Sequence, residues 1–135
     1  MVMRGKTFEM ESLRSLRQKR LTSVNFVMDY IELVFEDLVL AALALPILTD
    51  SGTVLEPSRA NYRDSLISKI ARTVVNTSET KEQLQVSLDD GSVIVLPLDA
   101  PSPSGPEMAT LSGRGTFFQS WLRPEAYDAD HGPSD

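Results

Sequence analysis

The sequence predicts an α+β fold, in which an antiparallel sheet of about five strands packs against one amphipathic helix, with a second, peripheral helix near the N-terminus. Three observations predict this fold. Alternating apolar residues flank Asp90-Gly91, which is typical of a β-hairpin. Two apolar stretches meet at Glu36-Asp37, which is typical of two strands joined by a tight turn. Over Tyr62–Ile70 every fourth residue is apolar, which is typical of a helix. The 135 residues are enough for one domain with a real hydrophobic core.

The first element is expected over Thr7–Leu21, a short helix whose thin apolar stripe includes Leu13 and Leu16. Residues 1–20 carry six basic and two acidic side chains, a net charge of +4, whereas the rest of the chain carries −10. Charge runs are most often solvated surface, and an acidic body argues against a phosphate-backbone binder. We therefore predict that residues 1–22 form a basic N-terminal helical appendage, and that the chain binds no nucleic acid and no membrane.

A single interior strand is predicted over Val24–Phe35, because both faces would be largely apolar and rich in β-branched and aromatic residues. Asp29 and Glu32 interrupt these faces, so each is expected near an edge, in an ion pair or in a cavity. Three positions apart on a strand, they point to opposite faces and form no catalytic pair. Pairing with Arg63 or Arg72 is the interpretation that we prefer.

The next strand is predicted over Leu38–Leu45, which follows a tight connection at Glu36-Asp37 and ends at Pro46. Asp50-Ser51-Gly52 is expected to be a turn that leads into a short strand, Thr53–Leu55. Both strands are counted in the same antiparallel sheet.

The packed helix is expected over Arg59–Ala71, with Ser58 as its N-cap and with Tyr62, Leu66 and Ile70 on its buried side. The opposite side of this helix is polar, so one face should pack on the sheet. The hydroxyl group of Tyr62 is expected to reach outward from the core.

The hairpin is predicted to turn within the Asp-Asp-Gly sequence of residues 89–91. Its turn is expected to contain two residues, Asp90 and Gly91. Counting outward pairs Leu88 with Val93 and Val86 with Val95, and places all four side chains on the core face. The two aspartates are assigned to the turn rather than to metal or acid–base chemistry, because Asp forms local backbone hydrogen bonds there.

A Pro-rich linker follows Asp99, and the core domain, predicted as α+β, is assigned to residues 23–112. Residues 113–135 are predicted to be an aromatic segment and a disordered acidic tail. The aromatic cluster could fold back over the sheet or dock on another chain, and we favour the first because large exposed apolar patches are uncommon. The cluster consists of Phe117, Phe118, Trp121 and Leu122.

The residue inventory removes most catalytic chemistry. The chain has no cysteine, and its single histidine, His131, lies in the acidic tail. There is therefore no thiolate nucleophile, no Cys/His zinc site and no histidine placed to act as a base, and we expect no metal and no cofactor. The longest apolar run, Leu38–Leu48, is too short to span a bilayer, and no disulfide framework is present. These features predict a cytoplasmic protein.

The chain contains five short patterns: Asp29-Tyr30-Ile31-x-Leu33-x-Phe35, the Leu/Ala strand closing on Pro46, Tyr62-Arg63-x-x-Leu66-x-x-x-Ile70-x-x-x-Val74, Leu84-x-Val86 before Asp-Gly, and Gly105-Pro106-Glu107. Together these patterns resemble a group of small bacterial proteins that share an α+β domain of unknown function. The resemblance covers about Val24 to Leu111, implies the α+β fold, and carries no activity. Glu107 is the one polar residue of interest among the matching positions. The chain differs from the group at Glu36-Asp37, where the group has a residue followed by glycine.

We predict a non-enzymatic protein-interaction module, an immunity-like or accessory protein, which binds a protein partner or a second copy of itself as a homodimer. The alternative is a small-ligand-binding protein or an enzyme, with a sheet–helix pocket lined by Asp29, Glu32 or Tyr30. A carboxylate with a raised pKa in that pocket would separate the two. The candidate binding residues for the interaction module are Trp121, Phe117, Phe118, Glu107 and Asp29.

Overall fold

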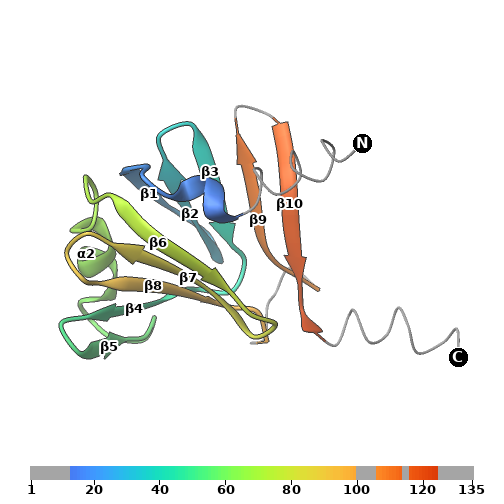
Figure 1. Ribbon diagram of the computed structural model, residues 1–135. Helices are drawn as coiled ribbons and strands as arrows, with labels where there is room; N and C mark the ends of the chain where they lie inside the picture. Colours follow the sequence, from blue (N-terminus) through green and yellow to red (C-terminus); the bar gives the residue numbers. More distant parts are fainter. Residues whose placement is uncertain (1–12, 100–105, 114–115, 125–135) are drawn as a thin grey trace, which may run out of the picture.

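The protein is mostly β-structure, and the predicted α+β fold is wrong. The computed structural model describes residues 13–99, 106–113 and 116–124, with the side chains of residues 116–118 excepted. In these residues the chain forms two antiparallel sheets of five strands each, instead of one sheet with a packed helix (Figure 1). The helices that lie wholly in this part of the chain are a 3₁₀ turn, η1 (Leu13–Leu16), and a six-residue α2 (Tyr62–Ile67).

The two sheets pack face to face around one core. In spatial order, the first sheet contains β1 (Leu21–Val27), β2 (Tyr30–Phe35), β3 (Leu38–Ala42), β9 (Glu107–Gly113) and β10 (Thr116–Leu122). The second sheet contains β5 (Thr53–Leu55), β4 (Ile47–Asp50), β8 (Val93–Pro97), β7 (Gln83–Leu88) and β6 (Val74–Glu79).

Backbone hydrogen bonds join the two sheets at one corner. The Leu21 N–H donates to the Arg72 carbonyl at 2.9 Å, and the Leu21 carbonyl accepts from the Ala71 N–H at 2.7 Å. The Val74 N–H donates to the Lys19 carbonyl at 2.8 Å. The entry to β1 is therefore bonded to the entry to β6, so the two sheets form one continuous structure at this corner (Figure 1).

The core lies between the sheets, and the first residues described contribute to it. Leu13 and Leu16 of η1 have no exposed surface and pack with the strand residues of both sheets. The predicted peripheral helix is therefore wrong for this segment: the chain makes one 3₁₀ turn and enters β1 at Leu21. The reason is that two buried leucines fill the space between the sheets, which a thin stripe on a surface helix could not do. Residues 1–12 lie outside the described part.

The predicted single strand Val24–Phe35 is a hairpin, formed by β1 and β2. The chain reverses at Met28, whose φ of 34° is in the left-handed region and whose side chain is fully exposed. Asp29 lies in the same turn and is exposed. Glu32 accepts a hydrogen bond from Asn25 at 3.3 Å. No ion pair of the described residues joins either carboxylate to Arg63 or Arg72, so the expected pairing is wrong. The Arg72 guanidinium group lies 3.8 Å from oxygens of Asp89 and Asp90 instead.

The predicted helix Arg59–Ala71 is much shorter than expected. Tyr62 and Leu66 are buried as predicted, but Ile70 is 37% exposed, so the apolar stripe does not continue. The helix gives way to turns because the Lys69 ammonium group reaches inward to carboxylates, and Ala71 then adopts a left-handed φ of 84°. The hydroxyl group of Tyr62 points inward rather than outward, and donates a hydrogen bond to the Pro46 carbonyl.

The hairpin of β7 and β8 is confirmed, but its register is one residue away from the prediction. Val86 pairs with Ile94, and the Leu88 N–H donates to the Ser92 carbonyl at 2.9 Å. The loop therefore contains three residues, and its last residue, Gly91, has a left-handed φ of 89°. As a consequence Ile94 and Ser92 face the core, not the predicted Val93 and Val95.

Candidate functional site

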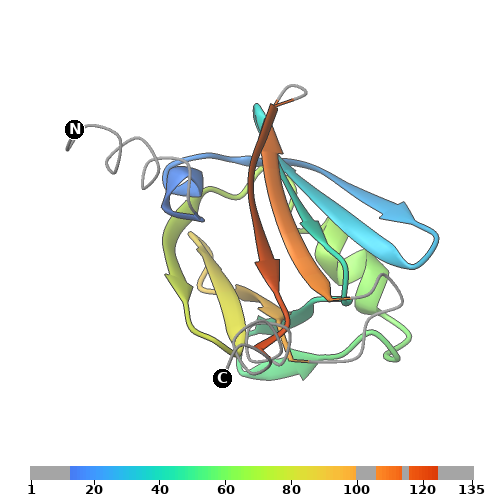
Figure 2. The ribbon, with the colours of Figure 1, turned by 90° about the vertical axis from the view of Figure 1, so that its right-hand side faces the viewer.

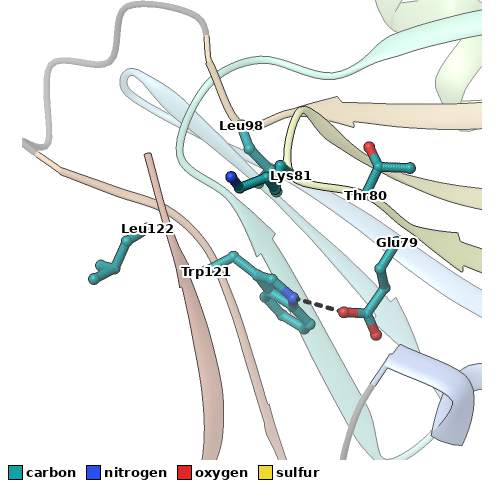
Figure 3. Close-up of a pocket in the computed structure, with 6 residues that line it drawn as sticks. All are labelled: Glu79, Thr80, Lys81, Leu98, Trp121 and Leu122. Carbon is teal, nitrogen blue, oxygen red and sulfur yellow. Dashed lines mark hydrogen bonds between the residues drawn. The ribbon is translucent and has the colours of Figure 1, made fainter. Parts of the chain in front are cut away.

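A pocket lies where β10 and the turn between β6 and β7 approach each other at the end of the two sheets (Figure 3). Its volume is about 510 Å³, and it is open to solvent on one side. Most of its lining is apolar, with three polar side chains at its edge. The lining residues are Glu79, Thr80, Lys81, Leu98, Trp121 and Leu122.

Trp121 forms the floor of this pocket. It lies in β10, where it pairs with Ala109 of β9, and it is only 6% exposed. Its indole N–H donates a hydrogen bond to the Glu79 carboxylate at 3.1 Å (Figure 3). This bond connects the first sheet to the second and fixes the plane of the indole ring.

The turn after β6 holds the polar edge of the pocket. The Thr80 hydroxyl oxygen accepts hydrogen bonds from the backbone N–H groups of Glu82 and Gln83, at 3.2 and 3.1 Å. The Leu98 N–H donates to the Glu82 carbonyl at 2.8 Å, which ties the end of β8 to this turn. Lys81 is therefore carried by an ordered backbone beside an apolar wall.

The charges at this site are only partly neutralised. One oxygen of Glu79 accepts from Trp121, which leaves the other oxygen for a further donor. Among the described residues, the Lys81 ammonium group has no ion-pair partner, and its side chain is exposed. An apolar surface with one unpaired cation and one half-occupied carboxylate can bind a group that is apolar in its body and charged at its end.

A second polar cluster lies at the opposite end of the second sheet and is satisfied by its own members. The Lys69 ammonium group is 2.8 Å from carboxylate oxygens of both Asp50 and Asp90. Asp90 also accepts hydrogen bonds from the Ser92 N–H at 3.0 Å and from the Ser92 hydroxyl at 2.6 Å. Lys69 is 5% exposed, so this cluster is a buried clamp between two turns and the end of α2.

The pKa values of the clamp favour its charged forms. Burial alone would raise the pKa of Asp90, but hydrogen bonds from Lys69 and Ser92 outweigh burial and hold this pKa well below its usual value. Burial alone would lower the pKa of Lys69, but hydrogen bonds to Asp50 and Asp90 raise it above its usual value. A group that exchanges protons during a reaction needs the opposite shift, so the clamp is structural.

The structure separates the five candidate binding residues. Trp121 lines the pocket, whereas Asp29 lies in the β1–β2 turn and is exposed. Glu107 begins β9, is exposed, and pairs with Leu122 across the strands. Phe117 and Phe118 belong to β10, but their side chains lie outside the described part.

The pocket at Trp121 is a different one from the sheet–helix pocket of the alternative prediction. No residue of α2 lines the described pocket, and none of Asp29, Tyr30 and Glu32 does so. Leu122 was part of the predicted aromatic cluster, but the lining residues of the second sheet were not found from the sequence, because Glu79 meets Trp121 across 42 positions and from a different sheet. No local pattern signals such a contact.

Three further observations bear on function. Comparisons of the chain with protein-family models, curated proteins and solved structures find no match. Within the described residues, no group of three or more His, Cys, Asp and Glu side chains could hold a metal ion. Neither η1 nor α2, the helices of the described residues, is long and apolar enough to cross a membrane. The resemblance to the bacterial group stays a prediction, and the α+β fold that it implies is not the observed one.

Proposed function

We propose that this chain is a non-enzymatic protein-interaction module, which holds a short segment of a partner protein in the Trp121 pocket. The observation that carries the proposal is a mostly apolar pocket beside the Lys81 ammonium group, which has no ion-pair partner within the described part of the chain. Binding sites combine an apolar lining with a few placed polar groups in this way, and tryptophan is enriched among the residues that dominate binding energy.

The lining defines the chemistry of the bound segment. An apolar side chain of the partner contacts the Trp121 ring and Leu98, and a neighbouring carboxylate pairs with Lys81. The free oxygen of Glu79 accepts a backbone N–H of the same segment. The segment is therefore extended, carries one acidic residue, and places an apolar residue beside it.

The test uses the only tryptophan of the chain as a reporter. A random peptide library displayed on phage is selected on the wild-type protein, and the enriched peptides are synthesised and titrated while the emission of Trp121 is recorded. We expect enriched peptides to contain an acidic residue beside an apolar one, and to change the emission on binding. Lys81→Glu should weaken their binding by about tenfold or more, since it places like charges together.

The matched control is Arg59→Glu, which makes the same change of charge at an exposed residue outside the pocket. Its affinity for the selected peptides should equal that of the wild type. If Lys81→Glu and Arg59→Glu bind these peptides equally well, or if no peptide changes the emission of Trp121, the proposed site is refuted.

A second candidate is a small-ligand-binding protein, which the size of the pocket favours. Its volume of about 510 Å³ lies within the range of about 300–1,000 Å³ of small-molecule sites. The ligand would be an aromatic or aliphatic carboxylate, and a library of such acids screened by ligand-observed NMR tests this candidate. Acids that bind the wild type and Arg59→Glu, but not Lys81→Glu, would favour it over the peptide. We also propose a cytoplasmic location, since a chain without cysteine gains nothing from an oxidising compartment.

A further inference from the structure

Three of the four edge strands of the two sheets are protected against pairing with another chain. Sheet edges expose unpaired backbone groups, and proteins shorten, cover or charge them to prevent association. The edge strand β5 has only three residues. The edge of β6 is covered where Arg17 donates to the Thr77 hydroxyl at 3.1 Å and to the Thr77 carbonyl at 3.2 Å. At the entry to β1, a loop covers the edge: the Leu21 N–H donates to the Arg72 carbonyl at 2.9 Å, and the Leu21 carbonyl accepts from the Ala71 N–H at 2.7 Å.

The fourth edge strand, β10, has none of these protections among the described residues. It is seven residues long, and its sequence contains no charged residue and no proline. Its only strand partner in the described part of the chain is β9, so its other side is the outer edge of the first sheet (Figure 2). A long uncharged edge is suited to pairing with another strand.

We propose that β10 pairs antiparallel with β10 of a second copy of this chain, about a twofold axis that passes midway between the two copies of Ser120. A strand that pairs antiparallel with its own copy is complementary to itself, as a closed dimer requires. The formal net charge of −6 makes two copies repel each other, so they can approach most closely through an uncharged element. This inference does not depend on the occupant of the pocket.

The register of β10 places the axis. Its pairing with β9 is irregular between Phe117 and Gln119 and again between Trp121 and Leu122. The regular stretch is therefore Gln119–Trp121, and Ser120 is its midpoint. Ser120 is half-buried and lies on the strand face opposite to Trp121, so a change at Ser120 spares the pocket floor. In the dimer, Ser120 faces its own copy and Trp121 faces Gln119 of the other copy.

The experiment measures the mass of the chain by light scattering and sedimentation over a dilution series. We expect the wild type to change from a monomer of 14.9 kDa to a species of twice that mass as its concentration rises. Ser120→Lys and Ser120→Glu should each raise the dimer dissociation constant by about fivefold or more, because the axis places like charges opposite each other. An equimolar mixture of these two variants should dimerise at least as well as the wild type.

Two controls distinguish the effect of charge on dimerisation from effects on folding and on strand propensity. Ser120→Thr retains an uncharged β-former and should dimerise like the wild type. Thermal melts must show that the Lys and Glu variants are folded, and dimerisation of their mixture shows it independently. A wild type that stays monomeric at every concentration overturns the proposal, and so does a mixture that stays monomeric while each variant is folded.

Discussion

The clamp around Lys69 predicts a large loss of stability on the substitution Lys69→Met. Methionine matches the length of the lysine stem and removes only the ammonium group, which leaves Asp50 and Asp90 without their shared cation. Removing one partner of a buried ion pair costs about 3–5 kcal/mol, and a hydrogen bond to a charged group contributes about 1.5–3 kcal/mol. The Asp50 and Asp90 side chains are 32% and 19% exposed, so water compensates in part. We expect a loss of about 2–3 kcal/mol in the free energy of unfolding.

The assay is urea denaturation at pH 7, followed by the emission of Trp121. Lys81→Met is the matched control, because Lys81 is exposed and has no ion-pair partner among the described residues. Its free energy of unfolding should change by less than about 0.5 kcal/mol. A Lys69→Met variant that is as stable as Lys81→Met would refute the account of the clamp.

The dependence of stability on pH provides an independent check of the same clamp. The folded protein holds the pKa of Asp90 below its usual value of 3.8, so the unfolded chain binds more protons as the acid range is entered. The contribution of Asp90 is therefore present above that value and is lost as the pH falls through the lower, folded value. The pKa of Lys69 is raised above 10.5, so its contribution is present below that value and is lost at higher pH. In Lys69→Met the loss at acid pH should be smaller than in the wild type.

Three further substitutions test the core, a buried hydrogen bond and a turn by thermal or urea unfolding. Val86→Asp should cost about 4 kcal/mol or more because Val86 is fully buried, whereas Gln85→Asp on the other face should cost less than about 1 kcal/mol; equal losses would refute the assigned faces. Tyr62→Phe removes the bond to the Pro46 carbonyl and should cost about 1–2 kcal/mol, and an unchanged stability would show that this carbonyl finds another donor. Gly91→Ala should cost about 1 kcal/mol from backbone strain alone, because no atom lies within 4 Å of the added carbon; a stabilised variant would contradict the left-handed turn.

The sequence predicted local features better than the arrangement of the sheets. Adjacent strands joined by short turns were found, such as the pair that meets at Glu36-Asp37 and the pair around the Asp-Asp-Gly turn. In the second pair, the predicted register differs from the observed register by one residue. The prediction counted two residues in the turn, while the observed loop adds Asp89 and places Gly91 in the left-handed position. Turn length is decided by such backbone details, which composition does not report.

β6 and the reversal at Met28 were missed for a different reason, since neither has the local sequence pattern that marks such an element. β6 escaped prediction because only Val74 and Thr77 are buried, and the strand is irregular between Val74 and Asn76, so the two-residue alternation is absent. The reversal at Met28 has no glycine or proline to mark it. Because β6 and this reversal were missed, the prediction assigned all strands to one sheet and assigned the six-residue helix α2 as a main element of the fold.

The candidate site was found only in part. Trp121 was singled out because aromatic residues gather near it, and the structure places it in the pocket. Glu79, Lys81 and Leu98 reach the same pocket from the second sheet, which was never assigned as a separate layer. Residues that meet only through the packing of two sheets cannot be brought together before the sheets themselves are known.

The backbone bonds at the corner between β1 and β6 have a consequence for how the molecule opens. These bonds connect residues near Leu21 with residues near Val74, so the two sheets cannot separate at this corner without breaking them. Local opening at this corner is therefore coupled to loss of the whole core. The amide protons of Leu21 and Val74 should exchange with deuterium only through global unfolding, at the slowest rates in the chain. The two sheets, although distinct in strand order, thus behave as a single cooperative unit.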